Sequence, residues 1–306
     1  RDVAPSRGLG DVYKRQELAG AGAIVLKSVF EEQIMMEAHH MATYGSPEGD
    51  DYLSTYVRSH ALNEYISLIE QTKKLCTIPV IASINCFSNS EWTDFARTVE
   101  AAGADALEIN ILSLQTEKEY QCGSFEQRHI DIVSSIKKQI SIPVIVKLGS
   151  NLTNPIALIN QLYANGANAV VLFNRFYQPD INIDTMTYSA GDVFSTPADL
   201  SYGLRWTAIA SAQVPQTDYA ISGGVHDGKA IVKAILAGAS AVELCSVIYQ
   251  RGNQVIADMT NEMTQWMNRQ GYKDISEFKN SMNALSTGAS NPFERTQFMK
   301  YFSSKE

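Results

Sequence analysis

Two short stretches near the end of the chain have the residue types that bind a phosphate group. The apolar run Tyr219–Ile221 breaks into Ser222-Gly223-Gly224, and a helical pattern follows. Adjacent glycines allow a backbone to turn tightly and to bring its N–H groups close to an anion. A second apolar run ends in the same way, at Cys245-Ser246. These two strand-to-helix turns, called the phosphate turns below, predict a phosphate site at helix N-termini.

A second set of polar residues lies where other apolar runs end. This set, called the strand-end group below, is Lys27, Ser28, Asn85, Asn110, Lys147 and Asn174. Any one of these residues could simply cap the helix that follows it. Lysines facing an electron-rich ring, with amides bonding to its edge, suit a flavin better than a sugar phosphate. The strand-end group as a whole therefore predicts a flavin site.

Composition excludes several other kinds of protein. The 306 residues carry a net charge of −8, which argues against a nucleic-acid or anionic-membrane partner. The four cysteines show no Cys-x-x-Cys spacing, so we expect reduced thiols, a cytoplasmic protein and no metal site. No apolar run reaches the roughly 18 residues that a membrane span needs. The sequence therefore gives no support to a quinone-linked enzyme that docks on a membrane.

An internal repeat identifies the elements that must position these residues. Four segments share a glycine, then Ala-x-Ala and an apolar run, and they begin at Gly20, Gly103, Gly166 and Gly238. Runs of a second kind, such as Ile142–Lys147, lie between them and carry proline near their start. Mostly apolar strands that alternate with helical segments indicate a parallel sheet covered on both faces.

The expected fold is therefore α/β, a (β/α)8 TIM barrel with its active site at the carboxyl ends of the strands. The predicted strands are 23–27, 79–84, 105–110, 143–147, 168–173, 218–222 and 240–244. The predicted helices are 59–74, 91–102, 125–139, 155–165, 199–212, 227–237 and 253–270. Seven strands are one short of a closed barrel, and the first strand should precede residue 18.

Residues 1–16 contain no strand-like apolar run, so we expect the first barrel strand to be missing or replaced. We interpret residues 1–16 as a non-native or disordered stretch, 17–283 as the barrel domain and 284–306 as a C-terminal tail. Two connections, Phe30–Ser59 and Arg175–Pro197, exceed the usual length of such loops. We interpret both as a lid or a dimer surface, and a homodimer is among the expected assemblies.

These runs together resemble the dihydroorotate dehydrogenase family of flavin barrels, including the related barrel domain of dihydropyrimidine dehydrogenase. The matching segments are Ile24–Ser28, Leu107–Asn110, Pro143–Leu148, Asn174, Ser222–Val225 and Ala237–Ser246, within residues 17–283. The resemblance implies FMN across the barrel mouth, bound by Lys27, Ser28, Asn85, Asn110, Lys147, Asn174, Ser222, Gly223, Gly224, Cys245 and Ser246. It also implies that Lys147 faces the pyrimidine end of the flavin.

The catalytic loop departs from the family pattern, which is Asn-x-Ser-Cys/Ser-Pro-Asn. This chain has Asn110-Ile-Leu-Ser113-Leu-Gln115, so Ser113 falls on the position of the base. The resemblance assigns catalysis to Ser113 and Asn110, and substrate binding to Asn110, Gln115 and Asn174. Cys122 is a competing base because a thiol ionises more easily than a hydroxyl. We favour Ser113, since Cys122-Gly123 looks like a pair that accompanies the base in the relative.

The resemblance implies oxidation of a dihydropyrimidine across a C–C bond, dihydroorotate to orotate, in pyrimidine metabolism. Two alternatives stay open because of the altered loop: dihydropyrimidine dehydrogenase-like activity, and a flavin-binding barrel with decayed activity. A phosphosugar lyase or isomerase, with Lys147 as a Schiff-base nucleophile, explains the phosphate turns but not the asparagines. Fumarate and a partner flavoprotein subunit are both open as electron acceptors.

Overall fold

A curled parallel sheet forms the centre of the molecule. The computed structural model describes residues 9–30, 50–85, 92–286 and 293–294. The strands are β1 (Ile24–Val25), β2 (Val29–Phe30), β3 (Val80–Asn85), β4 (Ala106–Ile111), β5 (Val144–Leu148), β6 (Ala169–Leu172), β9 (Asp218–Ser222) and β10 (Ala241–Glu243). They follow the order β1-β3-β4-β5-β6-β9-β10, with β2 also paired to β3, and every pair is parallel.

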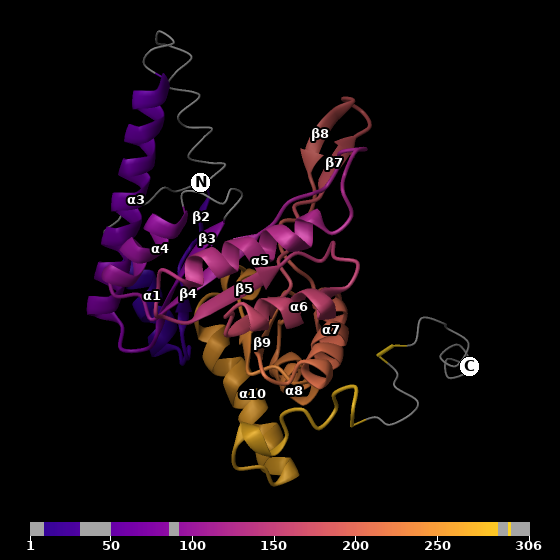
Figure 1. Ribbon diagram of the computed structural model, residues 1–306. Helices are drawn as coiled ribbons and strands as arrows, with labels where there is room; N and C mark the ends of the chain where they lie inside the picture. Colours follow the sequence, from indigo (N-terminus) through magenta and orange to yellow (C-terminus); the bar gives the residue numbers. More distant parts are fainter. Residues whose placement is uncertain (1–8, 31–49, 86–91, 287–292, 295–306) are drawn as a thin grey trace.

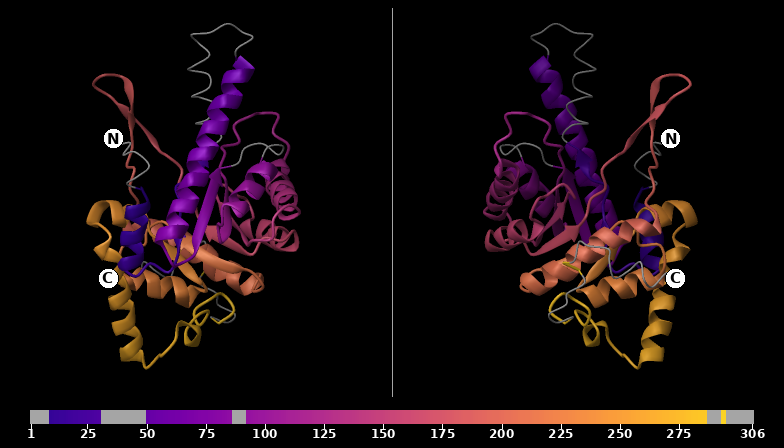
Figure 2. Two further views of the ribbon diagram at one scale, coloured as in Figure 1. Left: turned by 90° about the vertical axis from the view of Figure 1, so that its left-hand side faces the viewer. Right: turned by 90° about the vertical axis from the view of Figure 1, so that its right-hand side faces the viewer.

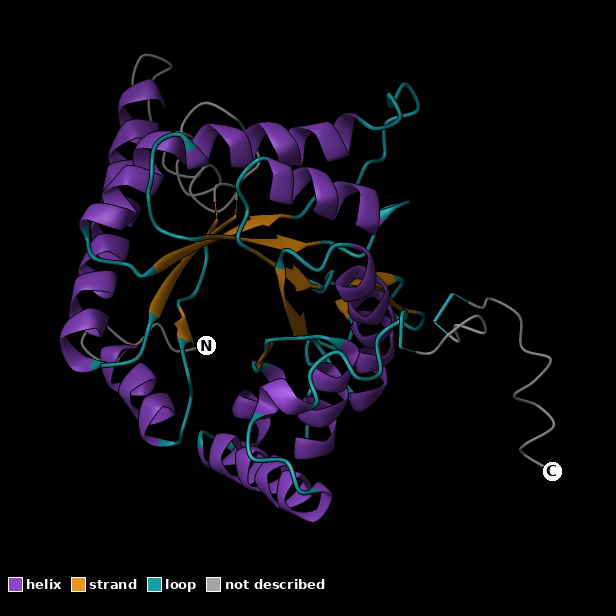
Figure 3. Ribbon diagram, turned by 60° about the horizontal axis from the view of Figure 1, so that its bottom comes forward, coloured by secondary structure: helices purple, strands orange, loops and turns teal. Residues whose placement is uncertain are grey.

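Helices cover the outer side of this sheet (Figure 3). They are α1 (Leu9–Leu18), α3 (Asp50–Leu75), α4 (Trp92–Ala101), α5 (Ser124–Lys137), α6 (Pro155–Ala164), α7 (Leu200–Gln213), α8 (Gly228–Ala237), α9 (Ser246–Arg251) and α10 (Gln254–Gln270). Two 3-10 turns, Pro197–Asp199 and Ile275–Glu277, lie among these helices in the chain order. Alternation of strand and helix along the chain is what a parallel sheet requires, because each crossover must return to the same end.

The core lies between the sheet and the helices. All six residues of β4 are buried, as expected for a strand that is covered on both faces. Ile69 of α3, Ile136 of α5 and Leu162 of α6 are almost fully buried in the same cluster. The predicted α/β barrel is confirmed, and each of the seven predicted strands has a counterpart.

The sheet stays open in the part of the chain that the structure describes, because no pairing joins β1 to β10. Helix α1 precedes β1, and its Leu9–Gln16 portion is helical where the sequence suggested no regular element. Tyr13 of α1 is buried in the main core, and Glu17 accepts hydrogen bonds from the backbone and hydroxyl of Thr77. Residues 1–8 lie outside the described residues, and the proposed domain boundaries stay predictions.

The two long connections differ in what the structure shows. Arg175–Pro197 contains a hairpin of β7 (Pro179–Asn182) and β8 (Thr187–Ala190), which projects from the barrel (Figures 1 and 2). Most of Phe30–Ser59, with His39 and His40, lies outside the described residues, although α3 already begins at Asp50. None of the described helices is long and apolar enough to cross a membrane.

Candidate active site

Most of the strand-end group comes together at the carboxyl ends of neighbouring strands. The sheet register pairs Asn85 of β3 with Asn110 of β4, and Asn110 with Lys147 of β5. Side chains at paired positions of adjacent strands leave the same face of the sheet. Asn174, which follows β6, donates from Nδ2 to Oδ1 of Asn110 at 2.7 Å. Its own Oδ1 accepts from the backbone N–H of Arg175 at 2.8 Å, which fixes the amide orientation.

Lys27 and Ser28 lie on a β-bulge between β1 and β2. Val25 pairs with Ile81 and Val29 with Ile84, so three residues of one strand oppose two of β3. A bulge of this kind changes the direction in which side chains point, and bulges are frequent beside active sites. Ser28 Oγ lies 2.7 Å from Ser83 Oγ of β3. The Lys27 ammonium has no hydrogen bond or ion pair to a described residue, so it is available to a ligand.

Two tyrosines support this bulge from the helix side. The hydroxyl of Tyr65, on α3, accepts from the Ser83 N–H at 2.7 Å and donates to the Ser83 carbonyl at 3.0 Å. These are the backbone groups that the bulge leaves without a strand partner. The hydroxyl of Tyr13 accepts from the Lys27 N–H at 3.3 Å. Burial raises the pKa of Tyr65, so its hydroxyl keeps the proton that the second bond needs.

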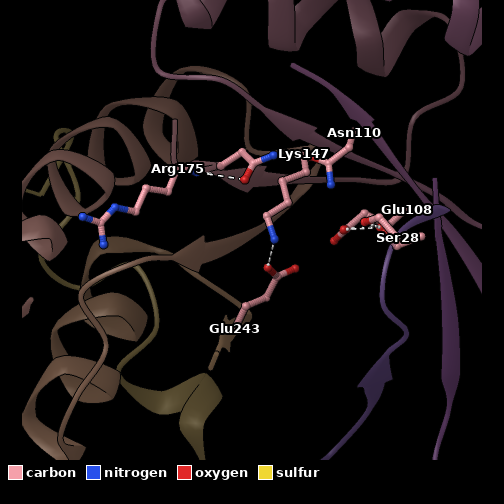
Figure 4. Close-up of polar contacts among 8 residues, drawn as sticks. Ser28, Glu108, Asn110, Lys147, Arg175 and Glu243 are labelled. Atoms are coloured by element: carbon pink, nitrogen blue, oxygen red, sulfur yellow. Dashed lines mark hydrogen bonds and ion pairs between the residues drawn. The ribbon is translucent and has the colours of Figure 1, made fainter. Parts of the chain in front are cut away.

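Two glutamates and a lysine meet inside the barrel, and the sequence analysis assigned no role to either glutamate. Lys147 Nζ donates to Oε2 of Glu243, on β10, at 2.5 Å. Glu108, on β4, is 1% exposed and accepts from Ser83 Oγ through Oε1 at 2.9 Å. Its Oε2 is buried without a partner among the described residues. Figure 4 shows the Lys147 ammonium pointing to the Glu243 carboxyl group, with Glu108 lying beside this pair next to Ser28. These three residues are called the carboxyl cluster below.

The three members of the carboxyl cluster have different charge states. Burial raises the pKa of Glu108 to about 8, and the nearby Glu243 carboxylate adds to this shift. Burial acts in the same direction on Glu243, but the Lys147 ammonium and several hydrogen bonds outweigh it and lower the pKa of that carboxyl. Burial disfavours the Lys147 ammonium, yet the two glutamates outweigh this effect and raise its pKa. At neutral pH, Lys147 is therefore a cation and a poor Schiff-base nucleophile.

The phosphate turns lie side by side because Ser222 pairs with Glu243 in the sheet register. Gly223 and Gly224 have φ angles of 93° and 73°, a region that favours glycine. A Cβ atom on Gly224 would lie 2.1 Å from the backbone nitrogen of Leu200, whereas one on Gly223 would meet open space. Among the described residues, neither glycine N–H donates to a protein acceptor, so both are available to an anion.

The long connection Arg175–Pro197 contacts the second phosphate turn through Ser195. Cys245 is the N-cap residue of α9, and burial raises the pKa of its thiol. Ser246 begins α9, and its hydroxyl accepts from the backbone N–H of Ser195 at 2.9 Å. His226 lies 3.1 Å from the Ser195 hydroxyl, and the described residues contain no cluster that could hold a metal ion.

The catalytic loop after β4 places Ser113 and Gln115 together. Ser113 Oγ accepts from Gln115 Nε2 at 3.1 Å, and the Ser113 carbonyl accepts from Asn151 Nδ2 at 3.0 Å. Cys122 is exposed and lines a pocket that is otherwise formed by Gln121 and by residues of α5 and its start. That pocket includes no member of the strand-end group.

Helix α5 carries a buried histidine below this loop. His129 is fully buried, and its Nδ1 donates to the Phe125 carbonyl at 2.7 Å. Its Nε2 has no partner among the described residues, and burial lowers the pKa of the imidazole. The ring is therefore neutral and packs in the core rather than binding a ligand.

The fold is thus a parallel α/β barrel with lysine and amide side chains at the carboxyl ends of neighbouring strands. The family model described as "Dihydroorotate dehydrogenase" matches residues 45–267, and the chain belongs to this family. Its members are flavin-dependent oxidoreductases that act on a CH–CH bond, so the predicted enzyme class is confirmed.

Similar proteins agree with this assignment. The chain is 27% identical to "Dihydroorotate dehydrogenase B (NAD(+)), catalytic subunit" of Thermoplasma volcanium, covering 87% of this chain and 88% of the relative. It is 30% identical to the protein of the same name from Methanocella arvoryzae, covering 79% of each. The crystal structure of DHODH in complex with ferulenol from Eimeria tenella matches with a TM-score of 0.57 and 15% identity. That match covers 72% of this chain and 66% of the other, and it supports the fold alone.

Proposed function

We propose that this protein is an FMN-dependent enzyme that oxidises dihydroorotate to orotate in pyrimidine biosynthesis. The observation that carries this proposal is the hydrogen bond between Asn110 and Asn174, which joins two amides at the mouth of a barrel of this family. Relatives with high coverage are named for dihydroorotate and not for another dihydropyrimidine. The dihydropyrimidine dehydrogenase-like alternative is therefore not favoured.

The residues at the barrel mouth fit FMN. The N–H groups of Gly223 and Gly224 and the start of α9 would hold the phosphate, because oriented N–H groups bind anions. Lys147 would face the pyrimidine end of the ring, and Lys27, Ser28 and the amides would line its edge. The buried Oε2 of Glu108, which has no partner among the described residues, adds a polar group inside the barrel beneath this mouth. When bound, FMN supplies the hydride acceptor that the oxidation needs.

The chain's own residues would bind the substrate and remove its proton. Asn110, Asn174 and Gln115 offer amide donors and acceptors to a dihydropyrimidine ring. Ser113 is the proposed general base, and it takes the proton from the ring carbon next to the one that loses hydride. Because Ser113 Oγ already accepts from Gln115, its own hydroxyl hydrogen can be passed to water or to another acceptor.

A reductive half-reaction screen tests this proposal. The purified protein, loaded with FMN, is mixed anaerobically with dihydroorotate, dihydrouracil or dihydrothymine, and the flavin absorbance is followed. We expect dihydroorotate to bleach the flavin fastest. Bleaching by dihydrouracil alone would support the dihydropyrimidine dehydrogenase-like alternative, and no bleaching by any of the three would support a decayed barrel. A protein that stays colourless with excess FMN would refute the proposal.

Two further expectations belong to the same proposal. Relatives are named as catalytic subunits of NAD(+)-dependent enzymes, which supports an electron-accepting partner subunit. Fumarate is the alternative acceptor, and the oxidative half-reaction with fumarate alone distinguishes the two. A homodimer is the proposed assembly of this chain by itself, and sedimentation of the purified protein tests it.

A further inference from the structure

The carboxyl cluster contains two acids but only one cation. Glu243 and Lys147 form an ion pair at 2.5 Å, and their side chains are 18% and 15% exposed. Glu108 lies against the same ion pair and is 1% exposed. Two carboxylates that share a buried site cannot both ionise without a large free-energy cost, since like charges repel strongly where water is excluded. One of the two acids therefore has reason to keep a proton.

The contacts of each acid show which one keeps it. Glu243 has a cation at hydrogen-bond distance, and the Ser222 hydroxyl also favours its charged form. Glu108 has only the neutral hydroxyl of Ser83 on Oε1 and no partner on Oε2. An ionised carboxylate with a buried, unpartnered oxygen is unfavourable, whereas a protonated acid loses less. The proton therefore belongs on Glu108.

The hydroxyl chain beside Glu108 identifies the protonated oxygen. Ser83 has one hydroxyl hydrogen, which it donates to Oε1 of Glu108 at 2.9 Å. Ser28 must then be the donor in its 2.7 Å contact with Ser83. Because Oε1 accepts, it is the carbonyl oxygen of the acid, and Oε2 carries the hydrogen. No hydrogen bond joins Oε2 to another described atom, and the nearby Glu243 carboxylate acts on Glu108 through its charge.

We propose that Glu108 and Glu243 hold one proton between them, and that this proton keeps the carboxyl cluster electrically neutral for FMN binding. The inference depends on the proposed FMN site, where Lys147 faces the electron-rich pyrimidine end of the ring. With the proton in place, the single positive charge balances the single negative charge. Loss of the proton leaves the cluster with a net charge of −1, which repels the carbonyl oxygens of the flavin.

The other groups that face Glu108 do not change this balance. Tyr65 and Cys245 are the further titratable groups whose charge is coupled to the cluster. Burial raises the pKa of both, so both stay neutral over the pH range in which Glu108 titrates. Ser83 and Ser222 supply hydrogen bonds without charge. Lys147 is the one cation facing Glu108 among the residues that the structure describes.

FMN affinity as a function of pH provides the test. FMN is titrated into the apoprotein between about pH 7 and 9.5, and flavin fluorescence reports binding; its phosphate stays dianionic because the second pKa is about 6. We expect wild-type affinity to be constant at low pH and to fall toward about tenfold per pH unit above the Glu108 pKa. Glu108→Gln carries no titratable proton, so its affinity should stay nearly constant.

Two further variants complete the design. Glu243→Gln leaves Lys147 to pair with Glu108, so the fall in affinity should disappear or move to lower pH. It also keeps the test decisive if Glu108→Gln does not fold. Glu70→Gln, on the exposed side of α3, is the matched control and should behave as wild type. An infrared carboxylic-acid C=O band in the apoprotein, absent from Glu108→Gln, reports the proton without any flavin.

The two proposals fail in different ways. No FMN binding by any variant at pH 7 would refute the FMN site and, with it, the role of the proton in binding. FMN binding with the same pH dependence in wild type and Glu108→Gln would refute the inference and leave the FMN site standing. An infrared band that persists in Glu108→Gln would place the proton elsewhere and overturn the assignment to Glu108.

Discussion

Tyr65→Phe is the substitution whose effect the structure defines most closely. It removes one hydroxyl, which bonds to both backbone groups of Ser83 at 2.7 and 3.0 Å. The ring stays, and so does its stacked contact with Phe95, so the change leaves almost no cavity. Ser83 is fully buried, and the bulge gives its N–H and C=O no partner in β1 or β2.

The expected loss of folding stability follows from the two backbone groups of Ser83 that Tyr65→Phe leaves without a hydrogen-bond partner. Leaving a buried donor or acceptor unpaired costs about 1–3 kcal/mol, so two such groups predict that the free energy of unfolding falls by roughly 2–6 kcal/mol. Tyr13→Phe is the matched control, because it removes one bond of 3.3 Å to the backbone N–H of the exposed Lys27. A loss of about 0.5–1.5 kcal/mol is expected there.

Denaturant unfolding of the apoprotein measures the difference between the two variants. Native-state hydrogen exchange at the Ser83 amide locates it, since that N–H should exchange faster in Tyr65→Phe alone. FMN affinity should fall in the same variant, because the bulge that carries Lys27 loses its support. Equal destabilisation by the two substitutions, with unchanged exchange at Ser83, would show that the Tyr65 hydroxyl does not support the bulge.

The remaining predictions concern the phosphate turn, the base and the core. Gly224→Ala should weaken FMN binding at least tenfold and lower stability, because its Cβ would lie 2.1 Å from Leu200 nitrogen; flavin titration and thermal unfolding measure both. Ser113→Ala should slow flavin reduction, measured by stopped-flow spectroscopy, by about 10²–10⁴-fold with FMN still bound, while Cys122→Ala should reduce flavin at nearly the wild-type rate. Slow reduction in Cys122→Ala with normal reduction in Ser113→Ala would contradict the assignment of the base. Burial lowers the pKa of His129, so the unfolded chain binds the proton more readily and stability should fall as pH drops below about 6.5. Denaturation of His129→Asn should show a weaker pH dependence, and an unchanged one would contradict the assignment.

Local sequence signals were sufficient for most of the barrel. The run predicted at 79–84 is β3, Val80–Asn85, because a strand buried on both faces must be apolar along its whole length. Glycines with positive φ end several helices, as at Gly238 after α8, which is why the repeat located the elements. The same alignment of strand ends placed Asn110 beside Lys147.

Two helical segments, α1 and the start of α3, were not predicted from the sequence. The sequence suggested no element at α1, whose position is fixed by the burial of Tyr13 and by Glu17 contacts to Thr77. It also placed the start of the next helix at residue 59, whereas α3 begins at Asp50. A short, polar segment such as α1 has a weak helix propensity, so its packing against the rest of the chain decides whether it forms.

The sequence alone thus determined the strands, the phosphate turns and the strand-end group, since each depends on residues that are close in the chain. Glu108 and Glu243 lie inside apolar runs of the sequence. An ionisable residue within an apolar strand was the signal that could have identified both as candidate site residues. The charge states of these two glutamates were decided by the tertiary structure. It brings Lys147 to Glu243 across 96 residues of sequence and leaves one oxygen of Glu108 buried without a partner among the described residues. Charge state depends on burial and on distances between groups remote in sequence, and only the folded chain sets those quantities.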